Sequence, residues 1–125
     1  MTKILIDTDI IIWLLKKNEL YVEKFIEAQN KGYIFLLSPI VSAEIYAGAF
    51  KREYQTIRQL FTFFQPLILD NTTGELAGKY ANKFRKSHNT ISLEDYLLAA
   101  TSKRENALLW TDNKKHFPMS EIKFY

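Results

Sequence analysis

The stretch KILIDTD, residues 3–9, places an apolar strand directly before an acidic turn. Thr8 or Asp9 can cap a helix that begins near Ile10, because both side chains accept hydrogen bonds from backbone N–H groups at a helix start. A strand that leads through an acid into a helix is typical of α/β proteins, whose ligands bind at the carboxyl ends of parallel strands. The segment therefore predicts that Asp7 lies at such a binding edge.

Apolar strands and helices alternate along the rest of the chain. Beyond the strand at 3–6, strands are predicted at 33–37, 67–69 and 107–110, with a short fifth at 122–124. Helices are predicted to start near residue 10, to span 21–31, 39–50 and 53–64, to follow a capping box formed by Thr72 and Glu75, and to begin after Ser92. Continuous apolar strands separated by helices indicate a parallel sheet. The sequence predicts a single-domain α/β fold, residues 1–125, with a parallel sheet of about four or five strands flanked by helices.

The composition fits a single cytoplasmic domain. A chain of 125 residues, 47% of them hydrophobic, can build one core. No apolar run approaches the roughly 18 residues that span a bilayer, so no membrane association is expected. No small-residue cleavage site follows the first apolar segment, which argues against a signal peptide. The absence of cysteine excludes disulfides and thiolate metal sites.

The positive charge of the chain is modest. The formal net charge is +3, and the Lys and Arg residues include adjacent pairs such as Lys51-Arg52 and Lys114-Lys115. Such pairs could contact phosphates. They could equally complement the macrodipole at helix C-termini. Charge alone is therefore a weak argument for a nucleic-acid substrate.

Four acidic residues from distant segments are predicted to meet at one edge of the sheet. Asp7 ends the first strand, Asp112 follows the fourth, Glu44 lies in the second turn of one helix and Asp95 in the first turn of another. Two unit charges about 4 Å apart repel by about 4 kcal/mol at an effective dielectric near 20. A chain that gathers such groups is expected to hold a hard divalent cation, which prefers oxygen ligands.

Each acid also has a structural explanation. Asp7 could simply end a strand near a helix N-terminus, Asp95 could cap its own helix, and Asp112 could be a turn residue. Glu44 resists this interpretation, because a buried carboxylate is costly unless it is paired or bound to metal. Its neighbours at helical spacing are apolar or small, namely Ile40, Val41, Ala47 and Gly48.

The remaining polar residues give weaker signals. Asp9 could be either a helix cap or a neighbour of the metal site, and the sequence does not decide between these roles. Asp70 is expected to form a turn. His88 and His116 lack a partner at ligand spacing, so they are expected to be surface or hydrogen-bonded residues and no zinc site is expected. Nine Phe and seven Tyr suggest that a partner or a second copy covers some apolar surface.

Four segments together resemble the PIN-domain family, and within it the VapC toxins of bacterial toxin–antitoxin pairs. They are ILIDTD at 4–9, Ser38-Pro39 leading to Glu44, EDYLLAAT at 94–101, and WTDN at 110–113 followed by His116-Phe117. The resemblance covers essentially the whole chain. It implies a ribonuclease that uses Mg²⁺ or Mn²⁺, acts on RNA, is inhibited by a small VapB-like antitoxin and commonly forms a homodimer.

The resemblance also implies roles for the four acids. Asp7, Glu44 and Asp95 match the first, second and third acids of the family, and either Asp112 or, through water, Asn113 fills the fourth position. One or two divalent ions held there would neutralise the scissile phosphate and lower the pKa of a bound water. Glu44 would share ligation or accept the proton of that water.

Neighbouring residues are expected to support this site. Thr8 and Thr111 resemble hydroxyls that orient the carboxylates. Lys114 and Lys115 stand close to the fourth acid and are expected to bind flanking phosphates of the substrate.

Two other function classes stay open. Asp7-Thr8-Asp9 after an apolar strand also resembles the opening motif of haloacid dehalogenase-like phosphatases, in which the first Asp is phosphorylated. The chain is short for that fold, and no glycine follows the second Asp. A non-catalytic α/β module that only binds a partner is the third possibility, and it predicts no stabilisation by cations.

Overall fold

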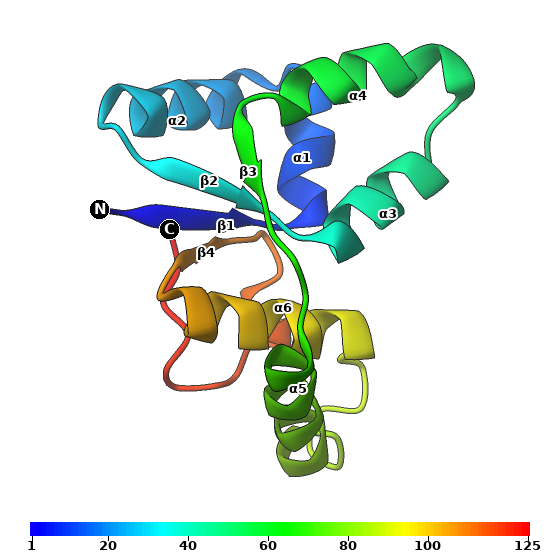
Figure 1. Ribbon diagram of the computed structural model, residues 1–125, viewed down its shortest axis with the longest axis vertical. Helices are drawn as coiled ribbons and strands as arrows, with labels where there is room; N and C mark the ends of the chain where they lie inside the picture. Colours follow the sequence, from blue (N-terminus) through cyan, green and yellow to red (C-terminus); the bar gives the residue numbers. More distant parts are fainter.

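A four-stranded parallel sheet with helices on both faces forms the molecule, for which the computed structural model describes all 125 residues (Figure 1). The strands are β1 (Lys3–Ile6), β2 (Ile34–Leu37), β3 (Phe64–Pro66) and β4 (Leu108–Trp110). Their order in the sheet is β3-β2-β1-β4, with β1 paired to both β2 and β4. The chain therefore changes direction across the sheet at β1, and this switch point is where parallel α/β sheets bind ligands.

Six α-helices connect the strands. They are α1 (Thr8–Leu15), α2 (Glu19–Asn30), α3 (Pro39–Ala47), α4 (Tyr54–Phe61), α5 (Asn71–Phe84) and α6 (Leu93–Glu105), with short 3-10 helices η1 (Lys51–Glu53) and η2 (Lys114–His116). In Figure 1, α1 to α4 lie on one side of the sheet, and α5 and α6 lie on the other. None of these helices is both long and apolar enough to cross a bilayer. The predicted α/β class, with a parallel sheet flanked by helices, is confirmed.

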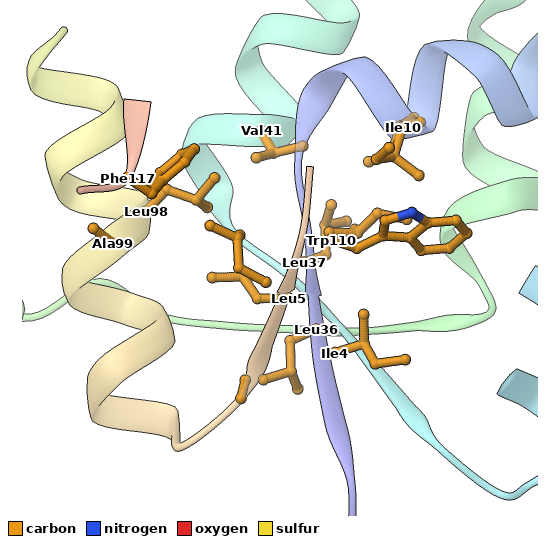
Figure 2. Close-up of a cluster of buried hydrophobic side chains, with 14 of the residues drawn as sticks. Ile4, Leu5, Ile10, Leu36, Leu37, Val41, Leu98, Ala99, Trp110 and Phe117 are labelled. Atoms are coloured by element: carbon orange, nitrogen blue, oxygen red, sulfur yellow. The ribbon is translucent and has the colours of Figure 1, made fainter. Parts of the chain in front are cut away.

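The central strand β1 anchors the core. Ile4, Leu5 and Ile6 are completely buried, because a strand covered by helices on both faces can bury every side chain. Successive side chains point to opposite faces. Figure 2 shows Leu5 on the side of Leu98 and Ala99 of α6, whereas Ile4 lies on the side of Trp110 and Ile10. Burying each such side chain contributes about 1.5–3 kcal/mol, and this packing fixes the carboxyl end of β1.

Side-chain caps then start the helices at that edge. Asp7 is the N-cap of α1, and its Oδ1 accepts a hydrogen bond from the Thr8 backbone N–H. Ser38 caps α3, and Ser92 caps α6 in a reciprocal capping box with Asp95. The prediction that Thr8 or Asp9 caps the first helix is wrong, because Thr8 is already helical. The cap of α1 is thus the residue that directly follows β1.

Several strand and helix boundaries differ from the predictions. The third strand is 64–66 rather than 67–69: only the backbone N–H of Leu67 continues the pairing, by donating to the Leu37 carbonyl, and Ile68 is 93% exposed. The 122–124 segment makes a single bridge, Leu109 with Phe124, rather than a strand. Two helices end early, at Ala47 and Phe61, where the predictions ran to 50 and 64.

The N-cap of α5 also differs from the prediction. Asp70, expected in a turn, accepts a hydrogen bond from the Thr73 backbone N–H at 2.9 Å, and the helix begins at Asn71. Thr72 and Glu75 lie inside the helix, so the predicted capping box is wrong. Asp70 rather than Thr72 is the N-cap because its carboxylate accepts from both the backbone N–H and the hydroxyl of Thr73.

Candidate active site

Asp7 lies at the carboxyl end of β1, where two neighbours fix its carboxylate. Oδ1 accepts from the Thr8 backbone N–H at 2.7 Å, and Oδ2 accepts from the Thr111 hydroxyl at 2.7 Å. The Thr111 side chain is buried beside the end of β4, and its oxygen also accepts from the Asn113 backbone N–H. Burial raises the pKa of Asp7, and the bonds from Thr111 and Thr8 oppose this change. The structure therefore brings the Thr111 hydroxyl to the Asp7 carboxylate.

Glu44 reaches the same edge from α3. Its Oε1 accepts from the Thr8 hydroxyl at 2.9 Å, so Thr8 joins Asp7 and Glu44 through its N–H and its O–H. The pKa of Glu44 is raised, first by partial desolvation and then by the negative charges of Asp7, Glu94 and Asp95. The expectation that an apolar helix face draws Glu44 into the interior is wrong, because the residue is exposed. It faces the edge that the other acids share.

Asp95 enters the site from the first turn of α6. Its Oδ2 lies 3.1 Å from Nδ1 of His116 on η2, and both side chains are about four-fifths buried, at 22% and 20% exposure. Asn113 places its amide nitrogen 2.8 Å from the same Nδ1. Of the two roles expected for His116, surface or hydrogen-bonded, the structure shows the hydrogen-bonded one, with Asp95 as a partner that the sequence did not indicate. His116 lies six residues after β4, at the same edge as Asp7.

The two contacts of His116 Nδ1 constrain its proton. A carboxylate oxygen only accepts hydrogen bonds, so Nδ1 must carry a hydrogen to bond Asp95 Oδ2. An Asn113 N–H group would then point at another N–H, which is unfavourable. Rotating the Asn113 amide by 180° places its oxygen there and satisfies all three groups, and amide orientation is assigned from such networks. His116 therefore donates from Nδ1 and fixes the orientation of the Asp95 carboxylate.

Asp112 has a different environment from the other acids. Its Oδ2 accepts from Trp13 Nε1 at 3.1 Å and from the Tyr21 hydroxyl at 2.7 Å. The bond to Asp112 raises the pKa of Tyr21 to about 12. The carboxylate is thus directed toward α1 and α2, while Asn113 is directed toward His116.

Asp9, which the sequence left open between two roles, also lies at this edge. Its Oδ2 accepts from the Asp112 backbone N–H at 3.0 Å, and this bond links α1 to the loop after β4. Burial and then the charge of Asp7 raise the pKa of Asp9 to about 6. Asp9 therefore adds a further negative charge beside Asp7.

We call Asp7, Asp9, Glu44 and Asp95 the acidic rim. Lys and Arg side chains pair with other acids of the chain, and none forms an ion pair with a rim member. In this arrangement, no group of three His, Asp or Glu side chains lies close enough together to bind a metal ion directly. The donors are nevertheless carboxylate oxygens, which hard divalent cations prefer, and the pKa values of Asp7, Asp9 and Glu44 are raised.

The basic pair after β4 lies on the solvent side of the loop. Lys114 and Lys115 are both exposed and belong to η2, the helix that carries His116. The Lys114 ammonium lies 5.4 Å from the centre of the Phe124 ring. Neither lysine contacts a rim carboxylate, so both remain free to meet an external anion.

Comparison with known proteins agrees with this arrangement. The family model described as PIN domain matches residues 4–122. Ribonuclease VapC10 of Mycobacterium tuberculosis is 31% identical over 118 residues, covering 94% of this chain and 88% of that protein. Ribonuclease VapC19 of the same organism is 31% identical over 115 residues, covering 92% of each. This chain belongs to the PIN-domain family, in its VapC-type branch.

Solved structures share the whole fold. VapBC2 from Rickettsia felis, bound to a DNA fragment from its promoter, contains a chain with a TM-score of 0.84, 21% identity and coverage of 99% of this chain and 98% of that one. VapBC from Salmonella typhimurium gives a TM-score of 0.85 at 20% identity, with 100% and 98% covered. These matches favour the PIN fold over that of a haloacid dehalogenase-like phosphatase.

Proposed function

We propose that this chain is a divalent-metal-dependent endoribonuclease and the toxin of a toxin–antitoxin pair. Its VapC-type relatives are named ribonucleases. The observation that carries the proposal is the acidic rim, where several carboxylates with raised pKa values share one edge without a Lys or Arg partner. A fold that leaves this repulsion uncompensated suits an external cation.

Asp7, Glu44 and Asp95 are the residues proposed to hold the ion, which is Mg²⁺ or Mn²⁺. When bound, such an ion neutralises phosphate charge and lowers the pKa of a water molecule. Glu44, the most exposed of the three, is placed to share ligation or to accept the proton of the attacking water. The oxygen donor set and the raised pKa values support this assignment.

The protein groups around these acids have separate tasks. Thr111 and Thr8 orient the carboxylates of Asp7 and Glu44 through their hydroxyls. His116 does the same for Asp95. For the fourth position, the direction of the Asp112 carboxylate toward Trp13 and Tyr21 favours Asn113.

Lys114 and Lys115 are proposed to bind phosphates beside the cut. Their exposure at the same edge as Asp7, and their freedom from rim carboxylates, support this role. Because each ammonium is a point charge, the lysines would position the RNA backbone without reading its sequence.

A VapB-like protein is proposed as the antitoxin, since structural relatives of this chain include VapBC assemblies and a toxin–antitoxin complex from Klebsiella pneumoniae. A groove between α1, α3 and α4, with a volume of about 280 Å³, is a suitable docking place. Its lining includes Ile12, Ile45 and Ile57, and it reaches Glu44. An antitoxin segment there would cover both apolar surface and part of the rim. A homodimer, which the resemblance to VapC toxins implies, and a location in the cytoplasm remain predictions. Exposed apolar residues such as Phe63 and Ile68 are available for a second copy to cover.

Cation dependence of RNA cleavage tests this proposal. The purified chain, freed of antitoxin, should cut RNA with Mg²⁺ or Mn²⁺, stop in excess chelator and resume when the ion is restored. Cleavage that continues in chelator would disprove the metal mechanism. An aspartyl-phosphate on Asp7 after incubation with a small phosphate donor would instead favour the phosphatase alternative.

A further inference from the structure

Three aromatic rings form a stack beside the acidic rim. Trp13 of α1 lies on Tyr21 of α2 with ring centres 5.5 Å apart and planes 12° apart. Tyr21 in turn lies on Trp110 at the end of β4, at 6.4 Å and 16°. Trp110 is buried, with 3% of its surface exposed, whereas Trp13 is 37% exposed. The stack therefore begins in the core and ends at an indole on the surface.

Asp112 fixes this stack to the active-site loop. Its Oδ2 accepts from both Trp13 Nε1 and the Tyr21 hydroxyl, so these two rings are held by hydrogen bonds at their edges as well as by stacking of their faces. Its backbone N–H donates to Asp9 of the rim. The preceding residue, Thr111, donates to Asp7. Two consecutive residues, Thr111 and Asp112, thus connect the exposed indole of Trp13 to the rim.

The surroundings of Trp13 suit a nucleic acid more than a purely structural role. Covering Tyr21 needs only one face of the indole. Lys16, the C-cap residue of α1, places its Nζ over the Trp13 ring, 5.6 Å from the ring centre, and this exposed side chain would have to move aside for a base to stack there. A fixed aromatic ring next to a lysine is the combination that holds single-stranded nucleic acids, because every base has a face that can stack.

We propose that Trp13 is a stacking platform for one base of the RNA next to the scissile phosphate, and that Lys16 contacts a phosphate of the same nucleotide. This inference rests on the proposed ribonuclease function and adds a subsite to it. Preorganisation by Asp112 lowers the entropy lost when the base binds. Stacking on one ring is tolerant of sequence, so the subsite should place the strand without selecting a particular base.

Binding of a single-stranded RNA oligonucleotide to the Asp7→Asn variant, in which cleavage is expected to stop, tests this subsite. Trp13→Leu should weaken binding roughly 5- to 150-fold, the range for loss of one stacked base. Trp13→Phe should bind within about 3-fold of its parent, because Phe keeps a stacking face. RNA should quench tryptophan fluorescence in the parent but not in Trp13→Phe, since the remaining Trp110 is buried.

Phe50→Leu is the matched control. Phe50 is 63% exposed and has Arg52 4.5 Å from its ring centre, so it offers the same pair of groups away from the rim. RNA affinity should not change in this variant. Thermal melts of every variant check that the fold is intact.

Three outcomes separate the alternatives. If Trp13→Leu binds RNA as tightly as its parent and RNA causes no quenching, the stacking subsite is refuted while cleavage by the wild type still supports the ribonuclease. If Trp13→Leu loses the antitoxin but keeps RNA, the indole belongs to a protein interface and the inference is equally refuted. If the wild-type chain neither binds nor cuts RNA, the proposed function fails and the subsite fails with it.

Discussion

Carboxylates at the rim and carboxylates on the α5–α6 side of the sheet have opposite surroundings. Asp70 caps α5 through Thr73 and receives Arg104 Nη1 at 2.6 Å, and these contacts lower its pKa to about 2. Glu121 accepts from the Tyr80 hydroxyl, which lowers the pKa of Glu121. At the rim, burial and neighbouring acids instead raise the pKa values of Asp7 and Asp9.

This difference separates acids whose charge is stabilised by partners within the chain from acids whose charge is left without a Lys or Arg partner. Asp70 and Glu121 each have a partner within the chain, so their charged forms are favoured. At the rim the charged forms of Asp7 and Glu44 are disfavoured, and carboxylates still converge from the end of β1, from α3 and from α6. Concentrations of such perturbed groups occur at functional sites.

One substitution at the rim and one at Asp70 should have the largest effects, on cleavage and on stability respectively. Asp7→Asn should reduce RNA cleavage at least about 100-fold, because it removes a proposed ligand charge, and should leave the melting temperature unchanged or higher. Asp70→Ala should do the reverse, with normal cleavage and a lower melting temperature because the cap of α5 is lost. Cleavage assays and denaturant melts of both variants measure the two effects. Wild-type cleavage by Asp7→Asn would contradict the site assignment.

A divalent ion should stabilise the rim. At a Mn²⁺ concentration 100 times its Kd, the free energy of unfolding should rise by about 2.7 kcal/mol, since the ion binds only the folded state. Asp95→Asn should lose most of this gain, and Asp70→Ala should keep it. Thermal melts with Mn²⁺ and with chelator give the measurement. An equal gain in Asp95→Asn and the wild type would place the ion elsewhere.

The positions of several rim residues could be predicted from the sequence, because local sequence patterns determine them. Asp7 follows an apolar strand, and Asp95 follows a Ser cap, so topology alone brings both to one edge. The structure agrees for Thr8 and Thr111, which bond Glu44 and Asp7. Their roles toward a metal ion stay predictions.

Other features depend on partners far along the chain. His116 meets Asp95, 21 residues away, and Asp112 meets Trp13, 99 residues away, so no local pattern reveals either contact. The position of β3 is set by pairing of Phe64 with Phe35 of β2 rather than by the apolar run that follows it. Long-range packing overrides local preference in such places.

Removing one supporting hydroxyl should have a smaller effect than removing a rim acid. Thr111→Val keeps the buried shape but removes the donor to Asp7 Oδ2, so cleavage should fall about 10- to 100-fold. Thr111→Ser keeps the hydroxyl and should recover most of the activity. Kinetics over a series of Mn²⁺ concentrations would show whether the loss lies in ion affinity. Equal activity of the Val and Ser variants would mean that this hydroxyl does not matter.

The smallest expected effect is the dependence of stability on pH without divalent ions. The pKa of Asp9 is about 6 in the folded chain against 3.8 ordinarily, so between pH 4 and 6 the folded state binds more protons than the unfolded state. The free energy of unfolding therefore falls as pH rises through this window. Because Asp9 is only half-buried, solvent screening should limit its share to about 1 kcal/mol.

Asp9→Asn isolates this contribution, since its amide oxygen can still accept from the Asp112 backbone N–H. Urea melts in chelator should show a flatter profile between pH 4 and 6 for Asp9→Asn than for the wild type. Asp70 does not interfere, because its pKa of about 2 confines its effect to lower pH. Adding Mn²⁺ should flatten the wild-type profile, as the cation replaces the protons that relieve repulsion at the rim. Parallel profiles for the two proteins would mean that Asp9 does not contribute to the pH dependence of stability. The pH dependence would then come from Asp7 and Glu44.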